Sequence, residues 1–297
     1  MKSESELDQQ LDFYLSYLKN IKFASPKTVT AYGHDLSKFA EFLKSQHINK
    51  VGSFAEIHVE EFLASVANGK SPANFSRKLY AIKGFCAYLE RKNLLTLKIT
   101  IKAPRNHRRN ISYLTETEAI RLLEAVKNSH LPYFAPRDTA IVSLLLNTGI
   151  RVSELTNLKV SDIEFRNEGF SHIKLLRKGG DESQLPVEIS VVKQIKKYLA
   201  GRISNENEAL FLSRKGKPIR PNTVYWLVRH YLEKAGIKKQ KMGPHILRHT
   251  AGTMLRAKGF DLVVIQKLLG HKKLETTGIY MHVEPKDLEN AVTALTY

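Results

Sequence analysis

The sequence predicts a mainly α-helical protein with a small β-sheet, in which an amino-terminal four-helix bundle precedes a carboxyl-terminal α/β domain. Three observations support this fold class. Apolar residues recur at helical spacing in four short segments of residues 1–98. Residues 99–112 then contain a proline, several basic residues and little periodicity, as expected of a linker. In residues 113–297, β-type patterns between about 163 and 187 interrupt longer helical ones. The chain has 297 residues, which is long enough for two domains with separate cores, at 1–98 and 113–297.

The four amino-terminal helices are expected at about 6–19, 26–43, 59–66 and 72–89. Two of them begin at Ser-Pro pairs, Ser25-Pro26 and Ser71-Pro72. Serine caps the free N–H groups of a helix start, and proline fits the first helical position. Each helix has one apolar stripe, so we expect the four stripes to meet in a compact bundle.

The net charge of +18 predicts a polyanionic partner. Residues 1–110 contain 18 Lys and Arg against 10 Asp and Glu, and residues 111–297 contain 29 against 19. Because both parts are basic, we expect both to grip the backbone of double-stranded DNA. Candidate DNA-binding side chains are Arg77, Lys78 and Lys83 on the polar side of the fourth helix and Arg108 and Arg109 in the linker. A solvated charged face is the alternative for the helix.

Several classes of protein are excluded by composition. No apolar run approaches the roughly 18 residues of a membrane helix, and no signal-peptide core follows the amino terminus, so we expect a cytoplasmic protein without a membrane partner. Cys86 is the only cysteine, which rules out an internal disulfide and a cysteine-based zinc site. The 11 histidines show no metal-ligand spacing, and we expect neither a metal nor a cofactor.

An arginine follows the most apolar helix of the second half. Thr115 and Glu118 form a capping box in front of one helix, and a second helix runs from about Asp138 to a glycine break at Gly149. Arg151 comes directly after this break. Its planar guanidinium suits two phosphate oxygens, and Glu154, three residues on, can orient it.

The β-type patterns at 163–165, 172–176 and 185–187 predict a small hairpin sheet. Arg177 and Lys178 lie at its expected tip. Helices are expected around 191–199 and 223–235, and we expect Trp226, on the second of these, to belong to the core.

Polar groups suited to phosphodiester chemistry recur between Gly243 and His282. His245 and Arg248 share one face of a helix that starts at Pro244. A second helix is expected from the N-cap Asp261 to Gly270, with His271 directly after it and Tyr280 nine residues later. Each residue alone is more often a packed core residue than a catalyst.

Together, the H-x-x-R, L-G-H and Tyr pattern resembles the carboxyl-terminal signature of the tyrosine recombinase/integrase family. The G-x-R-x-S-E-L run at 149–155 resembles the context of the family's first arginine, and Lys178, before a glycine, resembles its β-turn lysine. The family's usual small residue before that lysine is Arg177 here. The resemblance covers essentially the whole chain and is greatest to Xer-type members. It implies a SAM-like core-binding bundle and a catalytic domain with six catalytic residues: Arg151, Lys178, His245, Arg248, His271 and Tyr280.

The resemblance implies a site-specific DNA recombinase that cuts and rejoins duplex DNA through a 3′-phosphotyrosine and a Holliday junction. It also implies a homotetramer, or a heterotetramer with a related recombinase, on paired sites. A carboxyl-terminal segment, residues 285–297, would be donated to a neighbouring subunit; a helix folded back on its own domain is the alternative. Dimer resolution, as by Xer-type members, is the expected role. The alternatives are an integrase or transposase of a phage or mobile element, a type IB topoisomerase, and a catalytically silent DNA-binding protein.

Overall fold

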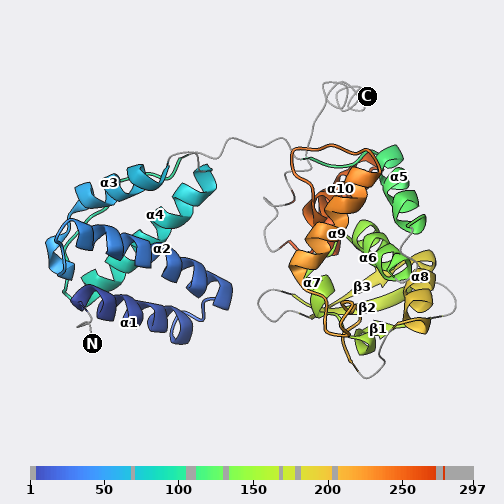
Figure 1. Ribbon diagram of the computed structural model, residues 1–297, viewed down its shortest axis with the longest axis horizontal. Helices are drawn as coiled ribbons and strands as arrows, with labels where there is room; N and C mark the ends of the chain where they lie inside the picture. The colour runs from blue at the N-terminus through green and yellow to red at the C-terminus, as the bar shows by residue number, and fades with distance from the viewer. Residues whose placement is uncertain are drawn as a thin grey trace, which may run out of the picture. The chain divides into compact units, whose positions relative to one another are not determined.

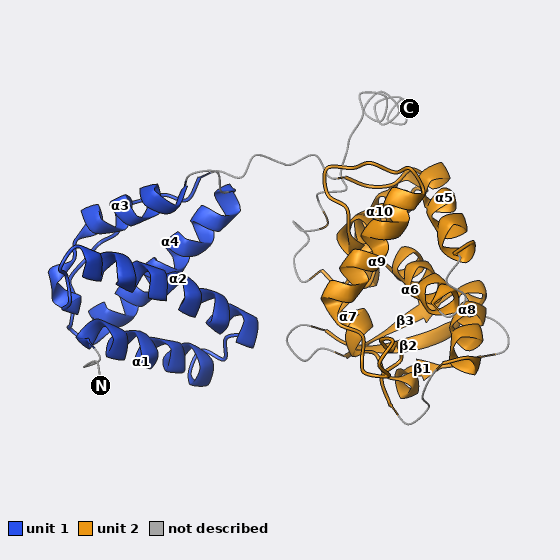
Figure 2. Cartoon of the chain, in the orientation of Figure 1, with its two compact units in different colours: residues 1–109 blue, residues 110–297 orange. Residues whose placement is uncertain are grey.

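The computed structural model describes residues 5–67, 71–104, 112–129, 134–166, 170–177, 182–202, 207–271 and 277. The chain divides into two compact units, residues 1–109 and 110–297 (Figure 2). Each unit has its own hydrophobic core. No helix of the described ranges is long and apolar enough to cross a membrane.

Unit 1 is a bundle of α1 (Glu6–Asn20), α2 (Pro26–Ser45), α3 (Glu56–Ala67) and α4 (Pro72–Arg91), with a short 3-10 turn η1 (Val51–Ser53) before α3 (Figure 1). The Ser25 side chain accepts a hydrogen bond from the Thr28 N–H at the start of α2, which confirms the expected cap. Ser71 is the N-cap residue of α4, but its side chain makes no capping hydrogen bond. α3 begins three residues before the expected position. Its first turn contributes only one large apolar side chain, Ile57, and this is 53% exposed, so the turn adds nothing to the apolar stripe.

The interior of unit 1 contains a charged cluster that the sequence did not predict. Lys78 was expected on the polar side of α4, but it is only 4% exposed. Its ammonium group lies 2.7 Å from a carboxylate oxygen of Asp35 on α2, a residue that is fully buried. Arg77 contacts the other oxygen of Asp35 at 3.1 Å. The placement of Lys78 on the polar side was therefore wrong, because the buried carboxylate of the facing helix draws its side chain inward.

Unit 2 contains α5 (Glu116–Lys127), α6 (Ala135–Thr148), α7 (Val152–Asn157), a 3-10 turn η2 (Val160–Asp162), a three-stranded sheet, α8 (Ile189–Ala200), α9 (Pro221–Lys234), α10 (Pro244–Ala257) and α11 (Leu262–Leu269). The sheet has the order β1 (Ile163–Glu164), β2 (Ser171–Leu176) and β3 (Glu182–Val187), with both pairings antiparallel. Ile173 pairs with Ile163 on one side and Leu185 on the other. The predicted hairpin and the mainly α fold class are confirmed.

α6 lies at the centre of unit 2, with α5, α8 and α10 packed around it (Figure 1). Its side chains are buried on nearly every face, including Ile141, Val142, Leu144 and Leu145. The capping box of Thr115 and Glu118 at the start of α5 is present as predicted. Because α6 is fixed by neighbours on all sides, the segment that follows it is held rigidly.

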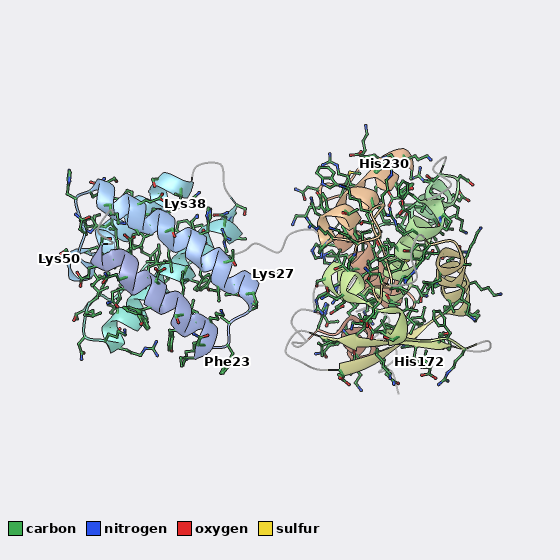
Figure 3. The ribbon with its side chains drawn as sticks, turned by 60° about the horizontal axis from the view of Figure 1, so that its bottom comes forward. Phe23, Lys27, Lys38, Lys50, His172 and His230 are labelled. Carbon is green, nitrogen blue, oxygen red and sulfur yellow. The ribbon has the colours of Figure 1, made fainter. Side chains whose placement is uncertain are left out.

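The prediction for Trp226 was wrong. This side chain is 55% exposed on α9, with the Arg229 guanidinium over its ring at 5.5 Å. α9 buries Val224, Val228 and Leu232 instead, so its apolar stripe runs along the other face. His230, also on α9, likewise lies at the surface of unit 2 (Figure 3).

Candidate active site

The first site residue, Arg151, is held by a sharp break after α6. Gly149 ends α6 in the left-handed conformation with φ +61°. Arg151 is the N-cap of α7, and its backbone N–H and its Nη1 each donate to Glu154, to Oε2 and Oε1 respectively, both at 2.7 Å. The Glu154 side chain is 6% exposed and that of Arg151 33% exposed. A buried carboxylate with two partners thus fixes an arginine whose other side remains accessible.

Arg248 lies on α10 and is only 7% exposed. Its Nη1 donates to the carbonyl of Gly149 and its Nη2 to the carbonyl of Leu269, both at 2.6 Å. The side chain therefore bridges the carboxyl-terminal end of α6 and that of α11. A lysine at this position would supply one charge without the fork that reaches both carbonyls.

His245 lies in the first turn of α10, three residues before Arg248. The start of this helix is fixed by α9, because the Tyr225 ring covers Gly243, where a Cβ atom would lie 2.6 Å from the ring. Partial desolvation lowers the pKa of His245 from its ordinary value of 6.5, and the charges of Arg248, Lys241 and Arg151 lower it further. The imidazole is therefore neutral at pH 7 and able to accept a proton.

His271 follows α11 directly and is 9% exposed. α11 has the Asp261 cap and ends at Gly270 with φ +65°, as predicted. The Nδ1 atom of His271 lies 2.9 Å from the Thr277 hydroxyl. Burial, followed by the charges of Arg248 and Arg151, lowers the pKa of His271 to about 4, so this ring is also neutral at pH 7.

Arginine side chains converge on the carboxyl-terminal end of α11. Arg248 donates to the carbonyl of Leu269, and Arg151 donates through Nη2 to the next carbonyl, that of Gly270, at 3.0 Å. A third arginine, Arg177, donates to the preceding carbonyl, that of Leu268, at 3.0 Å. The negative end of a helix dipole thus offsets part of the repulsion among three like charges, which Glu154 also reduces.

Two residues of this cluster were missed as site residues by sequence reasoning. Arg177 stood out only as a departure from the small residue usual before Lys178. His249 directly follows Arg248 in the motif, and burial, followed by its interactions with His245 and with the Arg248 cation, lowers its pKa to about 4. Neither residue has a spacing signal of its own, because its role depends on which elements face it.

Two of the six predicted catalytic residues, Lys178 and Tyr280, lie outside the described residues. So do Arg108 and Arg109 of the linker and the expected exchange segment, 285–297. Among the other DNA-binding candidates, Arg77 is partly exposed beside Asp35 and Lys83 is half-buried. Exposed lysines elsewhere on unit 1 include Lys27, Lys38 and Lys50 (Figure 3).

The described cluster has the chemistry of an anion site. Arg151, Arg177 and Arg248 are cationic, Glu154 is the carboxylate that pairs with Arg151, and three neutral histidines lie among them. Within the described ranges, no group of three or more His, Cys, Asp or Glu side chains is placed to hold a metal ion. An arrangement of fixed guanidinium donors beside a neutral imidazole base suits a phosphoryl group whose negative charge increases during reaction.

Two family models match this chain. Residues 112–287 match the model described as the phage integrase family, and residues 11–93 match its N-terminal SAM-like domain. A tyrosine recombinase XerC from Caldanaerobacter subterraneus subsp. tengcongensis is 33% identical over 95% of this chain and 85% of its own length. A tyrosine recombinase XerC from Thermodesulfovibrio yellowstonii is 34% identical over 93% of this chain and 92% of its own.

The fold is also similar to solved structures. A post-cleavage complex of the XerH site-specific recombinase with a palindromic difH substrate has a TM-score of 0.76 and 25% identity, over 99% of this chain and 90% of the other. A lambda integrase dimer bound to a COC′ core site has a TM-score of 0.71 at 18% identity, over 93% of this chain and 79% of the other, which shows similarity of fold.

Proposed function

Because the chain belongs to the phage integrase family of tyrosine recombinases, we propose that it exchanges DNA strands at specific sites in the manner of Xer-type recombinases. The observation that carries this proposal is the convergence of Arg151 and Arg248 on the end of α11 beside neutral histidines. This geometry supports phosphoryl transfer within a chain whose relatives are named tyrosine recombinases.

In the proposed reaction, the phenol oxygen of Tyr280 forms a bond to the phosphorus, and the bond from phosphorus to the 5′-oxygen breaks. His245 accepts the proton of the phenol, whose ordinary pKa of about 10 makes it a weak nucleophile near neutrality. The 5′-oxygen takes the electron pair of the broken bond and receives a proton from Lys178. The phosphate linkage is retained as a 3′-phosphotyrosine, so the 5′-hydroxyl of another strand can reverse the step.

The arginines stabilise the charge that develops during this step. Arg151 and Arg248 are held in advance by Glu154 and by backbone carbonyls, and their guanidinium groups would bind the non-bridging oxygens. His271, held by Thr277, would add a hydrogen bond. Hydrogen-bond donors that are fixed before the substrate binds need no reorganisation during the reaction. They therefore lower the barrier of the chemical step.

Covalent trapping on DNA tests the proposal. A duplex selected for binding is nicked near the presumed cleavage point, so that the 5′-hydroxyl fragment diffuses away, and the protein is compared with Tyr280→Phe on a denaturing gel. We expect a covalent adduct, formed without added metal or ATP, that is absent from the variant. Tight binding without an adduct from either protein, at several nick positions, would favour a DNA-binding protein without catalysis.

We further propose that the active assembly is a tetramer on two paired sites and that its role is dimer resolution. Each exchange must cut two duplexes in a coordinated way, which requires four nucleophiles and a closed assembly. Deletion of residues 286–297 is expected to abolish cooperative synapsis. A plasmid with two directly repeated copies of the selected site should be resolved into two circles, whereas relaxation of a plasmid by a monomer, without a partner site, would identify a topoisomerase instead.

A further inference from the structure

Arg177 joins three elements of unit 2 through one guanidinium group. It follows β2 directly, and its Nε donates to the Ser183 hydroxyl of β3 at 2.6 Å. Its Nη2 donates to the Leu268 carbonyl at the end of α11 at 3.0 Å. The side chain therefore crosses from the sheet to the helix end that Arg151 and Arg248 also bind.

Gly270 provides the space for this crossing. A Cβ atom at residue 270 would lie 1.3 Å from Nη1 of Arg177 and 2.3 Å from its Cζ. Nη1 is buried and has no hydrogen-bond partner among the described residues. The φ of +65° already favours glycine here, and a side chain at residue 270 would also require the Arg177 guanidinium to move from its place on the Gly270 backbone.

Arg177 is held in surroundings that disfavour its charge. Burial lowers the pKa of this guanidinium, as does the charge of Arg151, whereas Glu154 raises it. This half-buried cation lies near the charge of Arg151 and is held there by its hydrogen bonds to Ser183 and to the Leu268 carbonyl. The geometry fixed here is the distance between the last residue before the β2–β3 connection and the carbonyl end of α11.

We propose that Arg177 is a positioning residue of the active site, which ties the end of β2 to the carbonyl end of α11 and thereby restricts the placement of the next residue in the chain, Lys178. Lys178 follows Arg177 directly in the sequence, so loss of the tie should affect the step assigned to Lys178 first. The inference rests on the proposed function, in which Lys178 protonates the leaving 5′-oxygen.

Cleavage of duplexes with different leaving atoms can show whether Arg177 helps the acid or has another role. A duplex with a bridging sulfur in place of the 5′-oxygen has a thiolate leaving group, whose conjugate acid has a pKa of about 8.5, so departure needs no proton. A variant that is slow only because it fails to protonate the leaving 5′-oxygen should therefore cleave the sulfur duplex at a normal rate. A defect in phosphate binding or in folding is not rescued.

The experiment compares covalent-adduct rates of Arg177→Met, Lys178→Ala and a matched control, Arg166→Met, on oxygen and sulfur duplexes. Arg166 is an exposed arginine two residues after the end of β1, and its partner is Glu164. We expect Arg177→Met to slow cleavage of the oxygen duplex by about 10- to 100-fold and to cleave the sulfur duplex at a rate close to wild type. Lys178→Ala should show the same rescue, and Arg166→Met should resemble wild type on both duplexes.

Equal losses for Arg177→Met on both duplexes, with Lys178→Ala rescued, would overturn the positioning role and leave the proposed function intact. Failure of sulfur to rescue Lys178→Ala would instead refute the assignment of Lys178 as the acid and, with it, the role of Arg177. Arg177→Lys, which keeps the charge without the fork, should show a partial, sulfur-rescued defect.

A second measurement tests the packing without any reaction. Gly270→Ala should lower the Tm of the wild-type chain more than it lowers the Tm of Arg177→Ala, because removal of the guanidinium relieves the clash. Gly149→Ala is the matched control, since its φ of +61° is similar but its added Cβ would meet Leu269 at 2.5 Å. Its Tm loss should be the same in both backgrounds. If the Tm loss of Gly270→Ala were also the same in both, Arg177 would not be seated on Gly270 in solution, and the proposal would be wrong.

Discussion

At the scale of single residues, the site depends on histidines that remain neutral among arginines. Burial is the first cause for His245, His249 and His271, and the neighbouring guanidinium groups add to it. An arginine stays charged throughout the physiological range, so the local potential always opposes protonation of these rings. The arrangement supplies positive charge for a phosphate while it keeps a proton acceptor available.

The pH dependence of cleavage follows from the lowered pKa of His245. The active form is neutral and its pKa is lowered, so the adduct rate should fall in acid at a lower pH than an ordinary histidine base would give. Single-turnover rates on a nicked duplex measure this profile. A rate that already declines between pH 8 and 7 would contradict the assignment of His245 as the base.

Stability should also decrease in acid, because the pKa values of His249 and His271 are lowered to about 4 in the folded chain. Between pH 6.5 and 4 the unfolded chain binds more protons than the folded chain, so the free energy of unfolding falls as the pH falls. Thermal unfolding of wild type and of His249→Gln across this range measures the effect. The variant should lose less Tm than wild type; equal losses would exclude His249 as a contributor.

Arg248→Lys should slow adduct formation on the order of 10²-fold, because a lysine cannot reach the carbonyls of both Gly149 and Leu269 and still face a phosphate. DNA affinity, measured by fluorescence anisotropy, should change little. Arg166→Lys, at an exposed position two residues after β1, is the control and should leave the rate unchanged. A wild-type rate for Arg248→Lys would show that only its charge matters.

At the scale of elements, α2 and α4 are joined by a buried ion pair. Asp35→Ala leaves the ammonium group of Lys78 buried without its carboxylate, which we expect to destabilise unit 1 by roughly 3–5 kcal/mol. Asp35→Leu combined with Lys78→Met should recover most of this loss, because apolar side chains of similar volume replace both charges.

The two units provide separate signals for this test. Trp226 is the only tryptophan and lies in unit 2, so tryptophan fluorescence follows that unit alone. In urea, Asp35→Ala should produce an earlier transition in far-UV circular dichroism and an unchanged one in tryptophan fluorescence. Unchanged transitions in both signals would show that the pair contributes nothing to stability.

At the scale of the whole molecule, positive charge is distributed over both units rather than collected in one tail. Each phosphate neutralised by a protein cation releases counterions, so the slope of log Kd against log salt counts the contacts. The full chain should have a steeper slope on its selected duplex than a fragment of residues 110–297. Equal slopes would mean that unit 1 does not contact the DNA backbone.

The starts of several helices follow from local sequence, and the sequence alone predicted them. Caps such as Ser25, Thr115 and Asp261 act on N–H groups two or three residues away, so their effect does not depend on the fold. The Arg151–Glu154 pair is equally local, since the two residues share one turn of α7. Four of the six predicted catalytic positions could thus be placed on their elements in advance.

Only the tertiary structure decided which side chains face one another. Lys78 is buried because Asp35 lies opposite it on α2, and Trp226 is exposed because α9 buries its other face. Arg177 contacts the end of α11 because that end, 91 residues from it in sequence, presents the Leu268 carbonyl within reach. Periodicity shows which residues share a face, but the burial and the partners of that face depend on elements that are distant in the sequence and close in space.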